Sequence, residues 1–382
     1  MKERLVTFLK FACFVYLVFI IPKAISMWGN QDGDKRPHFM LGIENLASTT
    51  SGYKNLKKLK FGLICDNKSF DQSGQRTIDV LLSKGFDVKK IFVSENRKDS
   101  LTRKVFTAKR GRDIETDVPL YFVRGNPVKF IERNVDGLDA FFVDLHDEGV
   151  KSDKSITFLQ DLFGFASERE KRIVVLDKPN FFGGVIEGPG EIPWRHGLTI
   201  GELAVYINRH VIKSPANLTI VPLKRWRRGS SLANLCCADD GISKLLDPLY
   251  SVSVPTEKLS RWETSYFKRL CWNMGLSCAD GGPLHGLDLS LKKNISDFSI
   301  FNSFLTIGRF LSNRKQIELS FKDGFDGEFG FCDAREFLQG HCNFDTLKSK
   351  VERSLEEFYD KSKYCCLYKP LPRVVKPEIV KG

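Results

Sequence analysis

The stretch Ile192-Pro-Trp-Arg-His-Gly-Leu-Thr-Ile-Gly-Glu-Leu-Ala204 decides the fold class of this chain. An apolar strand predicted at 173–176 precedes it, and a loop then brings Arg195 and His196 to the start of a helix. Thr199 is predicted to cap that helix, and Glu202, three residues later, completes a capping box. Charged and imidazole groups between a strand end and a helix start are typical of ligand sites in open α/β folds.

Short apolar strands alternate with amphipathic helices along the chain. Strands are predicted over 59–65, 88–93, 120–123, 138–145, 173–176 and 218–221, and helices over 77–84, 155–169 and 201–209. This alternation predicts an α/β fold with a Rossmann-like, mostly parallel sheet that is covered by helices on both faces. The remainder predicts a smaller α+β domain with one clear helix over 345–359.

Shifts of composition divide the chain of 382 residues into five parts. These are a signal peptide or N-terminal anchor (1–26), a polar linker (27–54), a Rossmann-like candidate catalytic domain (55–228), an auxiliary α+β domain (229–370) and an extended tail (371–382). Lys2 and Arg4 precede an apolar run about half as long as a membrane-spanning helix. Such a start predicts export to the periplasm or cell surface, whereas an uncleaved segment would tether the chain to a membrane.

The formal charge of +12 is compatible with a polyanionic partner and equally with ordinary surface charge. No nucleic-acid motif, G-x-S-x-G, H-E-x-x-H, P-loop or dinucleotide-binding G-x-G-x-x-G is present. We therefore expect no nucleic-acid partner, no metal and no organic cofactor. In an oxidising compartment, at least one disulfide is expected among Cys271, Cys278, Cys332 and Cys342.

Polar side chains with acidic groups among them follow three of the predicted strands. Because the carboxyl ends of parallel strands meet at one edge of a sheet, we expect these side chains to face a common crevice. Two carboxylates in a crevice suit glycoside hydrolysis, in which one protonates the leaving oxygen and the other acts at the anomeric carbon. The side chains are Glu95, Asp144, Asp147, Asp177 and Asn180.

Further motifs surround the stretch quoted above. They are Phe61-Gly-Leu-Ile-Cys-Asp-Asn67, Phe142-Val-Asp-Leu-His-Asp-Glu-Gly149, Leu176-Asp-Lys-Pro-Asn180, Gly183-Gly184 and Val221-Pro-Leu-Lys-Arg-Trp-Arg-Arg228. In this order the motifs resemble the exo-β-N-acetylmuramidase family (NamZ-like), and the resemblance covers about residues 58 to 228. It implies an exported glycosidase that releases terminal N-acetylmuramic acid from peptidoglycan fragments.

The resemblance also implies roles for the candidate residues. Glu95 aligns with the glutamate of the family's P-E-H-G motif and would be the general acid/base, with Asp144 or Asp147 as the second carboxylate. Arg195 would bind the lactyl carboxylate of muramic acid, because its planar fork matches a carboxylate. His196 would contact the sugar or orient Glu95. The substrate-binding candidates are Asp177, Asn180, Arg195 and His196.

Each candidate also has a structural interpretation. Glu95 suits a solvated loop, and Arg195 and His196 suit a salt bridge and a cap. Asp177 and Asn180 suit turns, because both side chains bond their own backbone. The basic cluster 224–228 either contacts an anionic polymer or packs at a domain junction.

The chain departs from the family pattern at positions that carry the chemistry. The family's P-E-H-G is Ser94-Glu-Asn-Arg97 here, and its R-x-Y-T-Y run is replaced at 151–155. The motifs that support the fold are better kept. A second hypothesis is therefore a catalytically degenerate homologue that binds peptidoglycan or a protein partner without hydrolysis.

Overall fold

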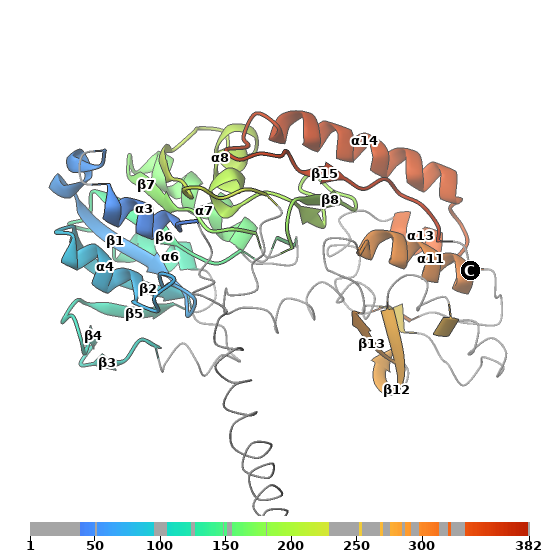
Figure 1. Cartoon of the computed structure of the whole chain (residues 1–382), viewed down its shortest axis with the longest axis horizontal. Coiled ribbons are helices and arrows are strands. Elements are labelled where there is room, and N and C mark those ends of the chain that lie inside the picture. The colour runs from blue at the N-terminus through green and yellow to red at the C-terminus, as the bar shows by residue number, and fades with distance from the viewer. Residues whose placement is uncertain are drawn as a thin grey trace, which may run out of the picture. The chain divides into compact units, whose positions relative to one another are not determined.

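Six parallel strands form the central sheet (Figure 1). The strands are β1 (Lys60–Cys65), β2 (Asp87–Ser94), β5 (Leu120–Val123), β6 (Ala140–Asp144), β7 (Arg172–Leu176) and β10 (Asn217–Val221). They lie in the order β10-β7-β6-β1-β2-β5, which is the doubly wound order of a Rossmann fold. The predicted fold class is therefore confirmed, and each predicted strand lies within about two residues of an observed one.

The computed structural model describes the chain from residue 39 onward, with gaps. The described residues are 39–49, 52–94, 105–123, 127–147, 149–150, 155–180, 182–228, 252–253, 268–269, 276–284, 287–291, 298–312, 320–321 and 333–380.

Both faces of the sheet bury apolar side chains. In β6, Phe141 and Val143 belong to one hydrophobic core, whereas Ala140 and Phe142 belong to the other. Successive residues of a strand point to opposite faces, so a strand that is apolar throughout needs cover on both sides. This is why the apolar runs predicted a parallel sheet.

Helices supply that cover (Figure 1). The helices α3 (Gly42–Ser48) and α4 (Thr77–Ser83) share the core of Phe142. The helices α6 (Pro127–Arg133), α7 (Ser155–Glu168) and α8 (Ile200–His210) share the core of Phe141. The helix α8 begins as predicted, because the Thr199 hydroxyl accepts from the Glu202 amide and the Glu202 carboxylate accepts from the Thr199 amide.

The stretch predicted as a polar linker, 27–54, contains the helix α3. Its Ile43 and Leu46 are buried in the core beside α4. A Cβ atom on Gly42 would lie 2.3 Å from the Asp177 amide nitrogen, so a glycine is needed where this helix starts against β7. Seven residues with few apolar positions show no period, which is why the sequence did not reveal this helix.

The described residues also form four smaller sheets. Their strand orders are β15-β8-β9, β3-β4, β11-β14 and β12-β13. The strands are β3 (Ala108–Lys109), β4 (Arg112–Asp113), β8 (Val185–Glu187), β9 (Arg195–His196), β11 (Val252–Ser253), β12 (Leu276–Leu284), β13 (Leu287–Leu291), β14 (Ser320–Phe321) and β15 (Arg373–Val374). Strand β9 lies inside the fold-deciding stretch, and β8 joins it to the C-terminal segment through β15.

The described residues of the region predicted as the auxiliary domain form three further helices. They are α11 (Ile300–Ser312), α13 (Asp333–Leu338) and α14 (Phe344–Ser362), and α14 confirms the helix predicted over 345–359. Residues of α11 and α14, such as Phe301 and Val351, share the hydrophobic core of Phe141, so the described part of this region packs together with the sheet in one compact unit. Residues 229–251 lie outside the described part, so the domain boundary at 228 stays a prediction.

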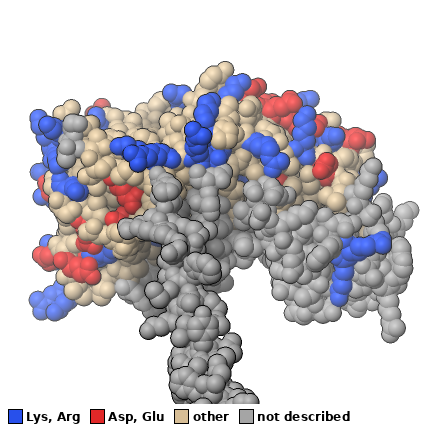
Figure 2. All heavy atoms as spheres, viewed as in Figure 1, with Lys and Arg blue, Asp and Glu red and all other residues tan. Residues whose placement is uncertain are grey.

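The predicted signal or anchor, 1–26, lies outside the described residues, as do Cys271, Cys332 and the side chain of Cys278. Among the described helices, none is both long enough and apolar enough to cross a membrane. Figure 2 shows basic and acidic side chains interspersed over the described part of one face. On this face the mixed charges fit general surface charge.

Candidate functional site

The strand order places a topological switch point between β1 and β6, where ligands of open α/β sheets bind. Asp66 follows β1, and Asp144, His146 and Asp147 lie at the end of β6. Asp66 Oδ2 accepts a hydrogen bond from the His146 amide at 2.8 Å, and the Ser69 hydroxyl donates to the Asp144 carbonyl at 2.6 Å. These bonds join the two strand ends and fix the backbone of the site.

Asp144 is fully buried at the last position of β6. Its Oδ1 atom lies 2.7 Å from Nζ of Lys178, and its Oδ2 atom accepts a hydrogen bond from the Thr77 hydroxyl. Burial raises the pKa of Asp144, although the ammonium group of Lys178 and the Thr77 hydroxyl oppose this. Asp144 therefore holds together the ends of β6, β7 and the start of α4.

Asp147 contacts His196 of β9, and both are buried. The Nε2 atom of His196 lies 3.1 Å from Asp147 Oδ2, and the Gly149 amide donates to Oδ1 at 3.0 Å. The Leu198 amide donates to Nδ1 of His196 at 3.3 Å, so Nδ1 carries no proton and the ring proton is on Nε2, facing Asp147. Burial would raise the pKa of Asp147, but His196, the Gly149 amide and His146 outweigh burial and lower it. Asp147 is thus an ionised carboxylate.

His146 is the half-buried member of this group. Its Nε2 atom is buried and has no hydrogen-bond partner among the described residues. Burial and the positive charges of Lys68 and Lys178 lower the pKa of His146 to about 4, although Asp66 and Asp147 oppose this. A neutral imidazole at the switch point can donate to or accept from a ligand hydroxyl.

Arg195, the neighbour of His196 in β9, faces away from Asp147. Its guanidinium lies 3.1 Å from Glu187 Oε1 and donates to the carbonyls of Phe182 at 2.6 Å and Phe298 at 2.7 Å. Arg195 and Glu187 are both fully buried. Adjacent strand residues point in opposite directions, which is why Arg195 and His196 do not meet. The contacts are those of the salt-bridged arginine given above as the structural interpretation.

Asp177 and Asn180 make turn and cap contacts. Asp177 accepts hydrogen bonds from the Gly201 amide at 2.7 Å, the Thr199 hydroxyl at 3.0 Å and the Tyr368 hydroxyl at 2.5 Å. Asn180 donates to the Leu198 carbonyl at 3.0 Å and accepts from the Phe182 amide at 2.8 Å. These bonds match the structural interpretation of both residues, and ligand contact by either stays a prediction.

The structure thus places Asp147 against His196 near the end of β6, where Asp144 is paired with Lys178, while Arg195 lies in a separate ion pair. Glu95 lies outside the described residues, so its place in the site stays a prediction. In the described part of the chain, no three His, Cys, Asp or Glu side chains are arranged to hold a metal ion.

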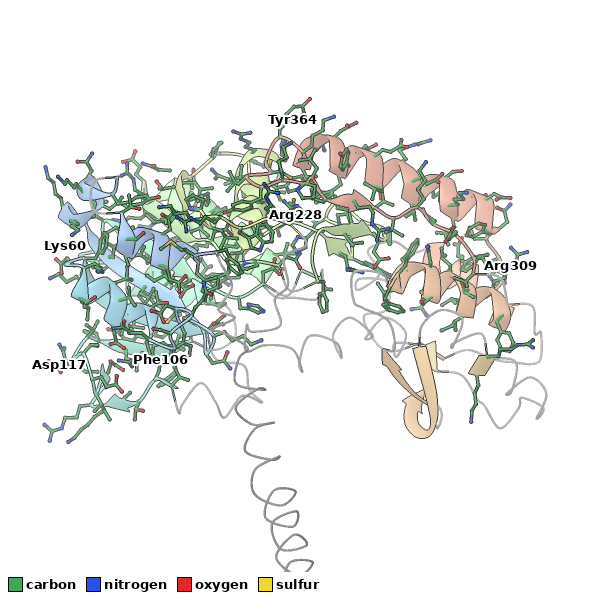
Figure 3. All side chains as sticks on the ribbon, viewed as in Figure 1. Lys60, Phe106, Asp117, Arg228, Arg309 and Tyr364 are labelled. Atoms are coloured by element: carbon green, nitrogen blue, oxygen red, sulfur yellow. The ribbon has the colours of Figure 1, made fainter. Side chains whose placement is uncertain are left out.

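Sequence reasoning did not single out Lys178, His146, Glu187 or Arg228. Lys178 and His146 stand inside the quoted motifs, and their positions after β7 and β6 were the available signal. Glu187 lies opposite Arg195 in the β8–β9 pair. Arg228 ends the basic cluster 224–228, but only its neighbours Lys224, Arg225 and Arg227 are exposed. Figure 3 shows Arg228 among the interior elements, whereas Tyr364 points outward.

Comparisons with known proteins show what the chain resembles in sequence and fold. Residues 61–236 match the family model of the exo-beta-N-acetylmuramidase NamZ N-terminal region. This segment is similar to the NamZ family. The chain is 29% identical over 209 residues to the peptidoglycan beta-N-acetylmuramidase NamZ of Bacillus subtilis. The match covers 51% of this chain and 50% of that protein. The chain therefore matches about half the length of this curated relative.

Two solved structures resemble this chain in fold. Both are DUF1343 family proteins of Bacteroides fragilis. The first has a TM-score of 0.66 and 21% identity, and the match covers 87% of this chain and 100% of that one. The second has a TM-score of 0.55 and 18% identity, covering 86% and 99%. At these identities the likeness concerns the fold alone.

Proposed function

We propose that this chain is an exported glycosidase of the exo-β-N-acetylmuramidase type that acts on peptidoglycan fragments. The observation that carries the proposal is the ionised Asp147 beside His196 at the switch point, within the segment 61–236 that matches the NamZ family model. A buried anion with its partner fixed in place suits a reaction in which positive charge develops on the sugar.

Glu95 and Asp147 would have different roles in the reaction. Glu95 would protonate the leaving oxygen, and Asp147 would face the positive charge that develops at the anomeric carbon. The lowered pKa of Asp147 fits the second role, because a group that is already ionised cannot donate a proton. Asp144 is paired with Lys178, so we assign it to the support of the strand ends. Neutral His146 would hydrogen-bond a sugar hydroxyl.

Turnover of a chromogenic N-acetylmuramide tests the proposal. We expect the wild type to release the chromophore, and Glu95→Gln and Asp147→Asn each to lower kcat by about a hundredfold or more. Matched controls are Glu132→Gln and Asp136→Asn, which make the same chemical changes at exposed positions before β6. If the wild type and Glu95→Gln turn over the substrate equally fast, Glu95 has no part in the mechanism. If the wild type shows no turnover, the proposed activity is refuted.

A second candidate function is binding of peptidoglycan without hydrolysis. The observation that favours it is the use of the motif residues for structure: Arg195 pairs with Glu187, and Asp177 caps α8. Sedimentation with insoluble peptidoglycan separates the two functions. If the wild type sediments with peptidoglycan but releases no muramic acid, and Asp147→Asn sediments to the same extent, the binding function is established and the glycosidase activity is overturned.

We also propose that the mature chain lies in the periplasm or at the cell surface. The support is the charged and apolar pattern of residues 1–26 together with a cell-wall substrate. Cell fractionation with mass spectrometry of the N-terminus tests it, and an unprocessed chain in the cytosol would contradict it. An intact N-terminus in the membrane fraction would instead identify a tether.

A further inference from the structure

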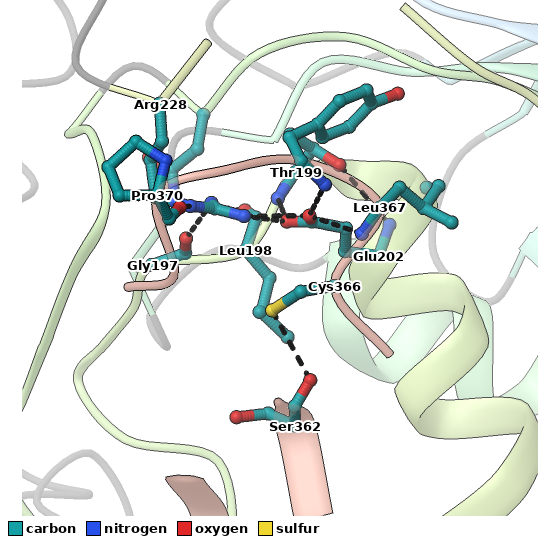
Figure 4. A network of polar contacts seen from close by, with 12 residues as sticks. Gly197, Leu198, Thr199, Glu202, Arg228, Ser362, Cys366, Leu367 and Pro370 are labelled. Atoms are coloured by element: carbon teal, nitrogen blue, oxygen red, sulfur yellow. Dashed lines mark hydrogen bonds and ion pairs between the residues drawn. The ribbon is translucent and has the colours of Figure 1, made fainter. Parts of the chain in front are cut away.

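The buried guanidinium of Arg228 joins its own segment to three others, at Glu202, Gly197 and Pro370 (Figure 4). Nη2 lies 2.6 Å from Glu202 Oε1 and 2.7 Å from Oε2. Nη1 donates to the Gly197 carbonyl at 2.5 Å, and Nε donates to the Pro370 carbonyl at 2.9 Å. The planar fork of arginine makes these directed bonds at once, which the single ammonium group of a lysine does not match.

The space for this side chain is provided by Gly184. A Cβ atom on that residue would lie 2.1 Å from Arg228 Cδ and 2.4 Å from Cγ. The glycine therefore admits the arginine stem next to β8. Within the basic cluster 224–228, Arg228 is thus a packed interior residue.

The bond from Arg228 to Gly197 reaches the candidate site through one peptide group. The Gly197 carbonyl and the Leu198 amide belong to the same planar unit, so the orientation of one fixes the other. Arg228 holds the oxygen at 2.5 Å, and the Leu198 N–H donates to Nδ1 of His196 at 3.3 Å. A cationic donor on the carbonyl polarises the peptide and strengthens the N–H as a donor.

That N–H decides which nitrogen of His196 carries the proton. With Nδ1 occupied as an acceptor, the neutral ring has its proton on Nε2, 3.1 Å from Asp147 Oδ2. Gly197 has φ = 66°, a conformation that glycine adopts readily, so the peptide needs an outside contact to hold its orientation.

We propose that Arg228 is a positioning residue: by holding the Gly197–Leu198 peptide, it fixes the His196 tautomer that faces Asp147. The consequence for catalysis rests on the proposed function, whereas the consequence for His196 does not. Glu202 shares the task, because its carboxylate holds the guanidinium and also accepts from the Leu367 amide at 2.8 Å.

Arg228→Lys is the test variant, since it keeps a cation beside Glu202 and loses the fork. Nitrogen-15 NMR of histidine-labelled protein reports the tautomer directly, and His196→Gln identifies the His196 signals. We expect the wild-type His196 to be protonated on Nε2 and Arg228→Lys to give a mixture of tautomers. Arg169→Lys is the matched control, because its pair with Glu132 is exposed at the opposite edge of the sheet.

Turnover gives the second readout. We expect Arg228→Lys to lower kcat by about tenfold to a hundredfold with KM changed by less than about twofold, as for a misplaced reacting group. Unchanged His196 signals in a folded Arg228→Lys protein would overturn the positioning role. A changed tautomer in a protein whose wild type shows no turnover would support positioning by Arg228 and refute the glycosidase.

Discussion

At the scale of single residues, Asp147 and Asp177 are buried acids whose pKa values move in opposite directions. Asp147 lies beside His196, and its pKa is lowered. Burial raises the pKa of Asp177 to about 7, which the negative charge of Glu202 reinforces although Tyr368, Gly201 and Thr199 donate hydrogen bonds. The difference follows from the partners, because hydroxyl and amide donors offset less of the cost of burying a charge.

The raised pKa of Asp177 predicts a loss of stability as pH rises. In the unfolded chain an aspartate has a pKa of about 3.9, so between about pH 4 and 7 the folded state binds the extra proton. The free energy of unfolding should therefore fall with rising pH across that window, by about 2–4 kcal/mol from this group. We expect urea unfolding from pH 4.5 to 8 to show this decline in the wild type and a flatter profile in Asp177→Asn.

The control for this measurement is Asp136→Asn, which removes an exposed carboxylate before β6. Its profile should follow that of the wild type. Parallel profiles for the wild type and Asp177→Asn would contradict the raised pKa of Asp177.

At the scale of elements, the start of α8 shows how glycines admit buried charges. Gly201 in its first turn leaves room for Asp177, because a Cβ atom would lie 2.6 Å from Asp177 Cγ. Gly184, just before β8, leaves room for Arg228 in the same way. The helix cap, the strand end and the β8–β9 sheet can approach one another only because both positions lack a side chain.

Gly184→Ala tests this packing at one position. The new methyl group would collide with the Arg228 stem, and we expect a loss of about 1–3 kcal/mol in the free energy of unfolding. Addition of the same change to Arg228→Ala should cost less than about 0.5 kcal/mol, since the colliding atoms are then absent. Urea unfolding of the four proteins in this cycle measures the coupling, and equal costs in both backgrounds would contradict the collision.

The elements were predictable where the signal is local. The six strands follow from short apolar runs, and the Thr199–Glu202 capping box spans only four residues. The partners within the site are distant in sequence: Arg228 and Glu202 are 26 residues apart, and Tyr368 and Asp177 are 191 apart. Periodicity and motif spacing do not predict which residues far apart in sequence are in contact. The sequence therefore identified Asp147 and His196 as candidates but did not identify the residues that support them.

At the scale of the whole molecule, the C-terminal segment joins parts that are distant in sequence. After α14 the chain returns past β8 toward α11 (Figure 1). The Arg373 amide donates to the Gly184 carbonyl at 2.7 Å, and the Val375 amide donates to the Ile186 carbonyl at 2.8 Å. Further on, the Val380 amide donates to the Thr306 hydroxyl at 2.9 Å. The segment thus holds β8, which pairs with the strand of His196, against α11.

A chain that ends at Lys369 should lose this support. It lacks β15, the Pro370 carbonyl that accepts from Arg228, and the bonds to Asn302 and Thr306 of α11. At about 0.5–1.5 kcal/mol for each lost bond, we expect a loss of several kcal/mol in the free energy of unfolding. Hydrogen exchange should quicken in 184–198 and 300–306 and stay slow in β1 and β6, because those strands keep their partners. A chain that ends at Val380 keeps every one of these contacts and is the control. If hydrogen exchange at 184–198 is unchanged in the shorter chain, the C-terminal segment does not stabilise that part of the fold.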